Sequence, residues 1–270
     1  MPELPEVEVV RGVLDNSLKG LTITKIDLLY PSIIDNDFDY FQQQVLNKRI
    51  VEIKRYAKYL IFILNDGAFI SHLRMEGKYF YVPEDEENFK HVHVVFHFDN
   101  NYKLMYQDVR KFGRIEFKPK DEVFTTEPLL KIGIEANNPN YDLESIYKKI
   151  NNKKLPIKTV LLDQTIVSGL GNIYVDEVLY KSHINPTRTA NSITIEEVSM
   201  IMKCSKEILD LAIINKGTTI RSYTSSLGVT GQYQNFLCVH TKTECPNCNC
   251  KLEKIKIGGR TSYFCSKCQR

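Results

Sequence analysis

Residues 245–268 read CPNCNCKLEKIKIGGRTSYFCSKC, and the cysteine spacing in this stretch decides how the end of the chain folds. Two Cys-x2-Cys pairs are present, Cys245 with Cys248 and Cys265 with Cys268. Four thiolates in two such pairs are the tetrahedral ligand set that suits zinc. Disulfides are the alternative, but a cytosolic chain disfavours them. We therefore predict one structural Zn²⁺ ion that does no chemistry itself, because four thiolates leave no open coordination position.

The segment between the two cysteine pairs predicts a hairpin with a glycine tip. Gly258 and Gly259 form the tip, and Arg260 follows them directly. A guanidinium held beside a tight turn can bind a phosphate through its planar fork. A solvent-exposed turn arginine is the simpler interpretation of this stretch alone.

A second glycine turn lies upstream, in DQTIVSGLGNIYVDEVLY at residues 163–180. Gly169, Gly171 and Asn172 stand between two predicted helices, where backbone N–H groups at a helix N-terminus bind anions. A tight turn between packed helices is the alternative. Charge favours the anion site, because residues 141–270 carry a net charge of +7 and residues 1–140 a net charge of −4. The second half thus has the electrostatics of a polyanion binder.

The first half changes its hydrophobic period early. Residues 3–19 predict a helix, with Pro5 in its first turn and Gly20 at its end. Short segments rich in β-branched and aromatic residues follow, and turn signals such as Asn65-Asp66-Gly67 separate them. Many short strands of this kind predict an antiparallel β-sandwich or barrel.

The second half predicts helices over about 142–150, 156–163, 173–181 and 195–215. Thr194 and Glu197 have capping-box spacing before the last helix, and Gly217 ends it. Residues 217–235 predict a loop. The chain has no run of about 18 apolar residues and no signal-peptide pattern, so we expect a cytosolic protein with no membrane contact.

The N-terminal PELPEVE, the GLGNIYVDE segment and the C-terminal GGRTSYFCSKCQ occur in this order, and together they resemble the formamidopyrimidine-DNA glycosylases, which excise oxidised purines. The resemblance spans the whole chain. It implies an α+β, multidomain fold: a catalytic domain over 1–131, with an N-terminal helix on a β-sandwich, and a hinge over 132–140. A helix-two-turn-helix domain would cover 141–235, with a loop at about 217–235 that closes over the damaged base. A zinc finger would cover 236–270, and DNA would lie in the cleft between the domains.

The resemblance also implies a nucleophile at the N-terminus. Removal of Met1 makes Pro2 a free secondary amine, whose pKa of about 8 leaves more free amine at neutral pH than the pKa of about 10.4 of a lysine does. Pro2 would attack C1′ and form an iminium, and Glu3 would be the acid/base residue at the sugar. Glu6 matches a further glutamate near the damaged base. By pattern alone, Glu3 is a helix-dipole carboxylate, and it could serve both roles.

Two further residues match the family's strand-cleavage steps. Lys58, in YAKYL, matches the lysine of β-elimination, although by pattern it is an outward-facing strand residue. Arg260 matches the finger arginine that binds phosphate and is linked to δ-elimination.

DNA contacts are implied at His91, Lys153 and Asn172. His91 also shares a predicted strand face with His93 and His97, so a second metal site is conceivable. We do not favour it, because no acidic or cysteine partner is evident near these histidines in the sequence.

Three residues match the set that fills the gap left by an extruded base, namely Met75, Arg110 and Phe112. An apolar wedge, an arginine for the orphaned cytosine and an aromatic wedge suit that task. For Met75 and Phe112 the alternative interpretation is core packing.

Two rival functions remain. The sister class, endonuclease VIII, prefers oxidised pyrimidines, but its start typically reads P-E-G-P-E and residue 4 here is leucine. A non-catalytic DNA- or RNA-binding protein would bind without covalent capture. We favour a monomeric enzyme that acts on double-stranded DNA containing an oxidised purine or an abasic site.

Overall fold

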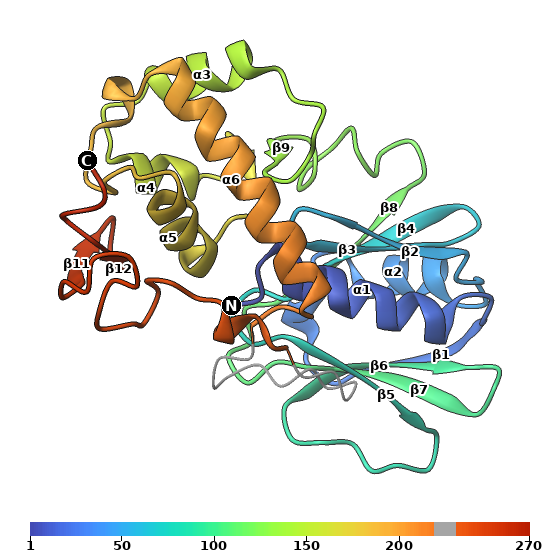
Figure 1. Ribbon diagram of the computed structural model, residues 1–270. Helices are drawn as coiled ribbons and strands as arrows, with labels where there is room; N and C mark the ends of the chain where they lie inside the picture. The colour runs from blue at the N-terminus through green and yellow to red at the C-terminus, as the bar shows by residue number, and fades with distance from the viewer. Residues whose placement is uncertain (219–230) are drawn as a thin grey trace. The chain divides into compact units, whose positions relative to one another are not determined.

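The computed structural model describes residues 1–218 and 231–270. Within these ranges the chain forms two compact units, residues 1–130 and residues 131–218 with 232–270 (Figure 1). Most of the loop predicted over 217–235 lies outside the described residues.

The first unit begins with helix α1, Leu4–Leu18, which confirms the helix predicted over 3–19. Glu3 is its N-cap residue, and Glu3 and Glu6 form a capping box in which the Glu3 N–H donates to Glu6 Oε2 at 2.9 Å. Leu14 and Leu18 lie on the buried face that the apolar spacing predicted.

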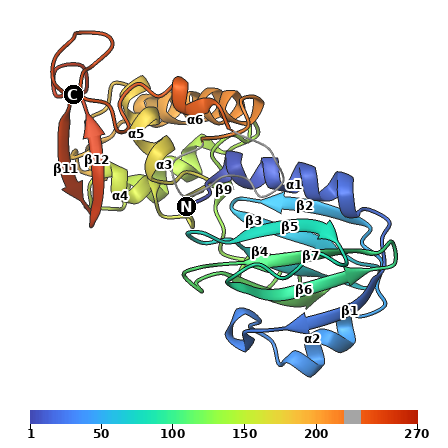
Figure 2. The same cartoon turned by 90° about the horizontal axis from the view of Figure 1, so that it is seen from below.

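Eight strands follow in the first unit, and they form two antiparallel sheets of four strands each. One sheet has the order β1-β6-β7-β5 and the other β2-β3-β4-β8, as the predicted sandwich requires (Figure 2). Their bounds are β1 Ile23–Leu28, β2 Glu52–Tyr56, β3 Tyr59–Ile63, β4 Gly67–His72, β5 Lys78–Pro83, β6 Val92–Phe98, β7 Tyr102–Gln107 and β8 Arg114–Pro119.

The segment IVEIKRYAKYLIFIL, residues 50–64, is rich in β-branched and aromatic residues throughout, but it forms two strands joined by a tight turn. β2 ends at Tyr56 and β3 begins at Tyr59, so Ala57 and Lys58 make the turn. The sequence does not predict this turn, because neither residue is a glycine, asparagine or aspartate, which are the residues that usually mark such turns.

Two short helices between β1 and β2 were also not anticipated, α2 Phe38–Val45 and the 3₁₀ turn η1 Pro31–Ile33. The Asp37 carboxylate accepts a hydrogen bond from the Tyr40 N–H and begins α2.

Aromatic rings from both sheets fill the sandwich core. Phe62 of β3 stacks on Phe69 of β4 with ring centroids 4.2 Å apart, and Phe69 stacks on Phe96 of β6 at 5.2 Å. Because Phe62 and Phe69 are in one sheet and Phe96 is in the other, Phe69 connects the two layers.

The second unit is mainly helical, and the four predicted helices are confirmed. Its elements are β9 Ile134–Glu135, α3 Leu143–Asn151, α4 Ile157–Leu161, β10 Val167–Ser168, α5 Asn172–Lys181, η2 Ala190–Ser192, α6 Ile195–Ile214, η3 Tyr233–Asn235, β11 Glu253–Ile257 and β12 Arg260–Phe264. The capping box of Thr194 and Glu197 is present at the start of α6. Part of the segment expected as a linker, 132–140, is the short strand β9, which pairs in parallel with β10.

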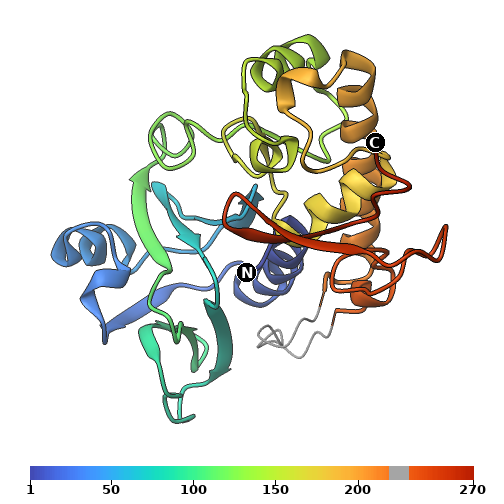
Figure 3. The same ribbon diagram turned by 90° about the vertical axis from the view of Figure 1, so that its left-hand side faces the viewer.

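The predicted C-terminal hairpin consists of β11 and β12, drawn in red in Figure 3. Ile257 pairs with Arg260, so Gly258 and Gly259 alone make the turn, with φ of 56° and 78°. Two consecutive residues with positive φ give the turn twist that antiparallel hairpins favour. No helix in the described parts of the chain has the length and apolar character needed to cross a bilayer.

We expect Phe69→Ala to lower the free energy of unfolding of the first unit by about 3–5 kcal/mol, because it leaves a cavity between two stacked rings. Urea denaturation followed by circular dichroism measures the loss. Phe124→Ala is the matched control, since Phe124 is 52% exposed and its loss leaves no core cavity. Equal midpoints for the two variants would contradict the role of Phe69 as the connection between the sheets.

Candidate active site and metal cluster

The start of the chain is buried, and a carboxylate holds it in place. Pro2 is buried, Glu3 is 2% exposed and Glu6 is 5% exposed. Because Glu6 accepts from the Glu3 N–H, it fixes the backbone directly after Pro2. Glu6 therefore holds the Glu3 backbone in place, a contact that the sequence left open.

Lys58 is only 5% exposed, which overturns its interpretation as an outward-facing strand residue. Its turn lies near His72, at the end of β4. Burial, together with the positive charges of Arg74 and Lys58, lowers the pKa of His72 to about 3. His72 is therefore neutral at physiological pH, and its Nδ1 accepts a hydrogen bond from the Arg74 N–H at 2.9 Å.

The loop that carries Arg110 and Phe112 is organised by one buried carboxylate. Asp108 is fully buried and accepts hydrogen bonds from the N–H groups of Arg110, Phe112 and Gly113 at 3.0, 2.9 and 2.8 Å. The Asp108 carbonyl oxygen also lies 2.7 Å from His93 Nε2. Four contacts to one residue give the loop a fixed conformation.

Gly113 is required by close packing at the same loop. A Cβ at this position would lie 1.6 Å from the hydroxyl of the buried Tyr106. Arg114 Nη1 donates to the Gly113 carbonyl at 2.7 Å and completes the support of the loop.

Met75 and Phe112 are not core residues, so the core-packing alternative is wrong for both. Met75 is 38% exposed and Phe112 is 49% exposed. The Arg110 guanidinium lies 4.8 Å from the centre of the Phe112 ring, in cation–π contact. Met75 and Phe112 line one recess of about 420 Å³ together with Met1, Arg74 and Arg114. Arg110 is not among the lining residues and is connected to the recess only through its contact with Phe112.

Unfavourable backbone conformations gather in the segments that carry these residues. Besides glycines and two asparagines, four described residues of the first unit have positive φ. They are Ala57, Arg74, His91 and Lys111, with φ of 51°, 51°, 65° and 59°. Asparagine tolerates this region, whereas other L-residues adopt it at a cost. Each of the four lies in a segment that also holds a predicted site residue, and such strain tends to occur at functional sites.

The three histidines do not form a metal site. His91 precedes β6, and His93 contacts the Asp108 carbonyl. The two ring nitrogens of His97 lie 2.6 Å from Glu84 and 2.9 Å from Asp27, so the expectation that no acidic partner lies nearby was wrong. Because these carboxylates face different nitrogens, they cannot share one ion with the ring.

The residues of the second unit that we expected to contact DNA lie near the hairpin tip or on the surface. Asn172, the first residue of α5, donates from Nδ2 to the Thr261 carbonyl at 2.9 Å. Arg260 is exposed and lines a recess of about 190 Å³ with Thr159 and Asp163. Lys153 is exposed in the turn after α3.

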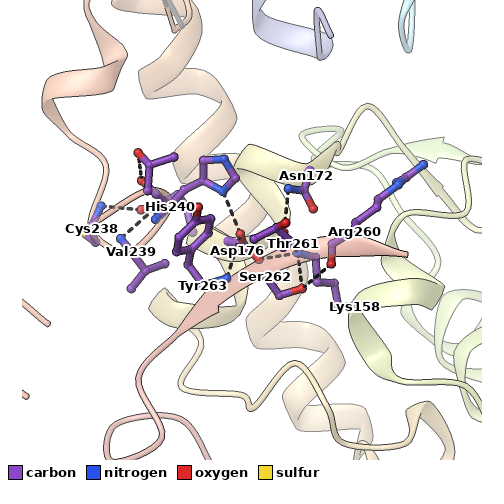
Figure 4. Close-up of polar contacts among 12 residues, drawn as sticks. Lys158, Asn172, Asp176, Cys238, Val239, His240, Arg260, Thr261, Ser262 and Tyr263 are labelled. Carbon is purple, nitrogen blue, oxygen red and sulfur yellow. Dashed lines mark hydrogen bonds and ion pairs between the residues drawn. The ribbon is translucent and has the colours of Figure 1, made fainter. Parts of the chain in front are cut away.

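A buried ion pair attaches the hairpin to the helices (Figure 4). Lys158 of α4 and Asp176 of α5 are both fully buried, with Lys158 Nζ 2.7 Å from Asp176 Oδ1. Lys158 Nζ also donates to Ser262 Oγ at 2.7 Å and to the Thr261 carbonyl at 3.2 Å. The Tyr263 N–H lies 3.3 Å from Asp176 Oδ2, so both charged groups contact β12.

The neighbouring Glu177 holds the chain that leads into the cysteine region. Its carboxylate accepts from three successive N–H groups, those of Cys238, Val239 and His240, at 2.7, 3.0 and 2.7 Å. Burial raises the pKa of Glu177, while these three donors oppose the rise. His240 Nδ1 lies 2.8 Å from Asp176 Oδ2, which joins this contact to the ion pair.

The four predicted metal ligands form one cluster, in which all ligand atoms lie within 4.8 Å of one another. The Cys245 and Cys268 sulfurs are 3.8 Å apart, and those of Cys248 and Cys265 are 3.5 Å apart. These separations are too long for a disulfide, whose S–S bond is about 2.05 Å. They suit a metal ion, because tetrahedral bonds of about 2.3 Å place two thiolates about 3.8 Å apart.

Sequence reasoning missed the carboxylates that organise both units. Asp108, Asp176 and Glu177 carry no motif, and in the sequence they look like surface charges. The signal available for Asp176 and Glu177 is their position inside a helix whose other residues are mostly apolar.

We expect Asp108→Asn to loosen the loop that carries Arg110 and Phe112, because an amide nitrogen cannot accept the N–H bonds that a carboxylate oxygen accepts. The cost is about 1–3 kcal/mol for a buried donor left unpaired. Amide hydrogen exchange at residues 112 and 113 measures the change, with the exposed Asp99→Asn as control. Exchange as slow as in the unchanged protein would contradict the role of Asp108.

Comparison with known proteins identifies the family. The model of the formamidopyrimidine-DNA glycosylase N-terminal domain matches residues 1–115, and the model of the H2TH domain of the same glycosylase matches residues 132–224. Formamidopyrimidine-DNA glycosylases of Streptococcus pneumoniae serotype 4 and Lactobacillus gasseri are 43% and 45% identical, over all of this chain and 99% of theirs.

Solved structures agree over the full length. The complex of wild-type Lactococcus lactis Fpg with DNA containing N7-benzyl-Fapy-dG has a TM-score of 0.93 at 40% identity, and the complex of the same enzyme with abasic-site DNA has the same values. Both matches cover 100% of each chain. With both domain models matched and relatives above 40% identity along its whole length, the chain belongs to the formamidopyrimidine-DNA glycosylase family.

Proposed function

We propose that the protein excises oxidised purines, 8-oxoguanine and formamidopyrimidines, from double-stranded DNA and then cleaves the strand at the abasic site. One observation carries the proposal: Met1 lines the same recess as Met75 and Phe112. The end of the chain that would supply the nucleophile therefore lies beside the side chains that would fill the gap in the duplex. The DNA bound by the Lactococcus lactis relative, with a modified Fapy-dG or an abasic site, supports this substrate class.

The proposed chemistry begins with removal of Met1, which converts the Pro2 nitrogen from an amide into a secondary amine. Its lone pair attacks C1′ of the damaged nucleoside, the bond from C1′ to the base breaks, and the base leaves with the bonding electrons and takes up a proton. The first product is an aminal, in which C1′ is bonded to both the Pro2 nitrogen and O4′. The nitrogen then loses its proton, its lone pair forms the C1′=N bond as the C1′–O4′ bond breaks, and O4′ takes up a proton. The ring-opened product is a cationic iminium, which accepts electrons in the following β-elimination. Glu3 handles the proton at the sugar, and Glu6 holds Glu3 in place.

Strand cleavage uses two cations. Lys58, buried in its turn, assists β-elimination at the sugar. Arg260 binds a phosphate beside the damaged nucleotide and assists δ-elimination. Its exposed position next to the two-glycine turn leaves the guanidinium accessible to a phosphate.

DNA binding divides between two kinds of contact. Met75 and Phe112 insert as apolar wedges, and Arg110 pairs with the orphaned cytosine. His91, Lys153 and Asn172 bind backbone phosphates, which position the duplex without reading its sequence.

We further propose that the cysteine cluster holds one Zn²⁺ ion. The donor set supports zinc, because four thiolates close a tetrahedral site without an open position. Cys245, Cys248, Cys265 and Cys268 would then stabilise the hairpin that carries Arg260. A monomer in the cytosol, where thiols stay reduced, suffices for this function.

Borohydride trapping tests the proposed reaction. The protein is mixed with an 8-oxoguanine:cytosine duplex and reduced, and any adduct is mapped by mass spectrometry. We expect a covalent adduct on Pro2 and its loss, together with most base excision, in Pro2→Gly. An adduct only with oxidised pyrimidines would assign the protein to the sister specificity, and DNA binding without any adduct from a chain that lacks Met1 would indicate a non-catalytic binding protein.

We expect zinc removal by a chelator to abolish DNA binding and to lower the melting temperature, because the hairpin depends on its metal for folding. Metal analysis by mass spectrometry should give one zinc per chain before treatment. Re-addition of zinc should restore binding, which separates metal loss from irreversible damage. Full DNA binding after verified loss of the metal would refute the structural role.

A further inference from the structure

Arg74 has an exposed guanidinium that no carboxylate neutralises. Among the described residues it forms no ion pair, whereas Arg11 and Arg55 of the same unit both pair with Glu8. Within the described parts of the chain, its backbone N–H donates to His72 Nδ1, and its guanidinium makes no hydrogen bond. The charge of the side chain is therefore available to a ligand.

Two carboxylates line a small cavity with Arg74, and each forms its ion pair with another cation. Asp35 and Glu116 line a small cavity together with Arg74. Asp35 pairs with Arg114 at 3.2 Å, and Glu116 pairs with Lys118 at 2.6 Å. A positive charge thus persists beside Met75 in a half of the chain whose net charge is −4.

The backbone of Arg74 points to a function for its side chain. Its φ of 51° lies in the left-handed region, where glycine is free of strain and arginine is not. The chain accepts this conformation directly before Met75. The Arg74 side chain also lines the recess of Met75 and Phe112. Backbone strain, an unpaired charge and this position together make Arg74 a candidate for ligand contact.

We propose that Arg74 is a further DNA-binding residue, whose guanidinium binds a backbone phosphate of the duplex next to the gap that Met75 fills. This inference rests on the proposed function. Phosphate is the ligand that an exposed arginine fork suits, because two N–H groups can bind two phosphate oxygens. Arg110 differs, since its guanidinium is already in contact with the Phe112 ring.

The experiment compares Arg74→Ala, Arg74→Gly and Arg74→Lys with the unchanged protein on a duplex containing a tetrahydrofuran abasic analogue. Dissociation constants are measured at several sodium chloride concentrations. We expect the Ala and Gly variants to bind about tenfold more weakly, as loss of a charged hydrogen bond predicts. Their salt slope should fall by about one, and the Lys variant should keep the slope.

The two neutral variants separate the side chain from the backbone. Both lose the charge, but only glycine relieves the positive φ. We expect Arg74→Gly to melt a few degrees higher than Arg74→Ala while both bind DNA equally weakly. The matched control is Lys25→Ala. Lys25 is 62% exposed and pairs with Asp27 of the same strand, β1, whereas Arg74 follows β4 of the other sheet. Loss of Lys25 should therefore leave the salt slope unchanged.

Single methylphosphonate substitutions in the duplex identify the phosphate. At one position, neutralising the phosphate should remove the difference between the unchanged protein and Arg74→Ala. Equal affinity and equal salt slope in Arg74→Ala and the unchanged protein would overturn the inference. If the unchanged protein traps DNA on Pro2 in that case, only the role of Arg74 fails; if it neither traps nor prefers the tetrahydrofuran duplex, the proposed function fails with it.

Discussion

The buried pair of Lys158 and Asp176 is the interaction on which the second unit depends. Neither side chain reaches water, so each charge needs the other and every remaining hydrogen-bonding group around it. Ser262, Thr261 and Tyr263 supply those groups, and all three belong to β12. Removal of one partner from such a pair costs about 3–5 kcal/mol, because it leaves an uncompensated buried charge. The strand that carries Arg260 is thereby attached to α4 and α5.

The first unit uses the same physical device without the cation. A buried carboxylate accepts backbone N–H groups, three at Asp108 for the loop of Arg110 and Phe112 and one at Glu6 for the start of α1. Charge-assisted bonds of this kind are stronger than neutral ones. They hold the backbone beneath the exposed side chains in place, which is the preorganisation that the proposed insertion of these side chains into a duplex would require.

The sequence was sufficient for the fold class, for α1 and the four helices of the second unit, and for the metal cluster, because these follow from periodicity, capping and ligand spacing. It did not predict the features that depend on contacts between residues far apart in the chain. Lys58 reads as a strand residue, and only the positive φ of Ala57 reveals the turn that buries it. The functions of Asp108 and Asp176 depend on partners that come together only in the folded chain. The exposure of Met75 and Phe112 could not be predicted from the sequence either, because methionine and phenylalanine are most often buried.

The attachment of the hairpin to α4 and α5 limits how the zinc finger can be exchanged between related proteins. A cysteine-bound finger is often treated as a cassette that can be transplanted whole. Here the finger strand β12 completes the hydrogen bonding of a lysine and an aspartate that belong to α4 and α5. A graft that moved residues 236–270 alone would leave those two charges without their neutral partners. The cassette that can be exchanged therefore includes both helices, and substitutions at 158, 176 and 262 should be inherited together.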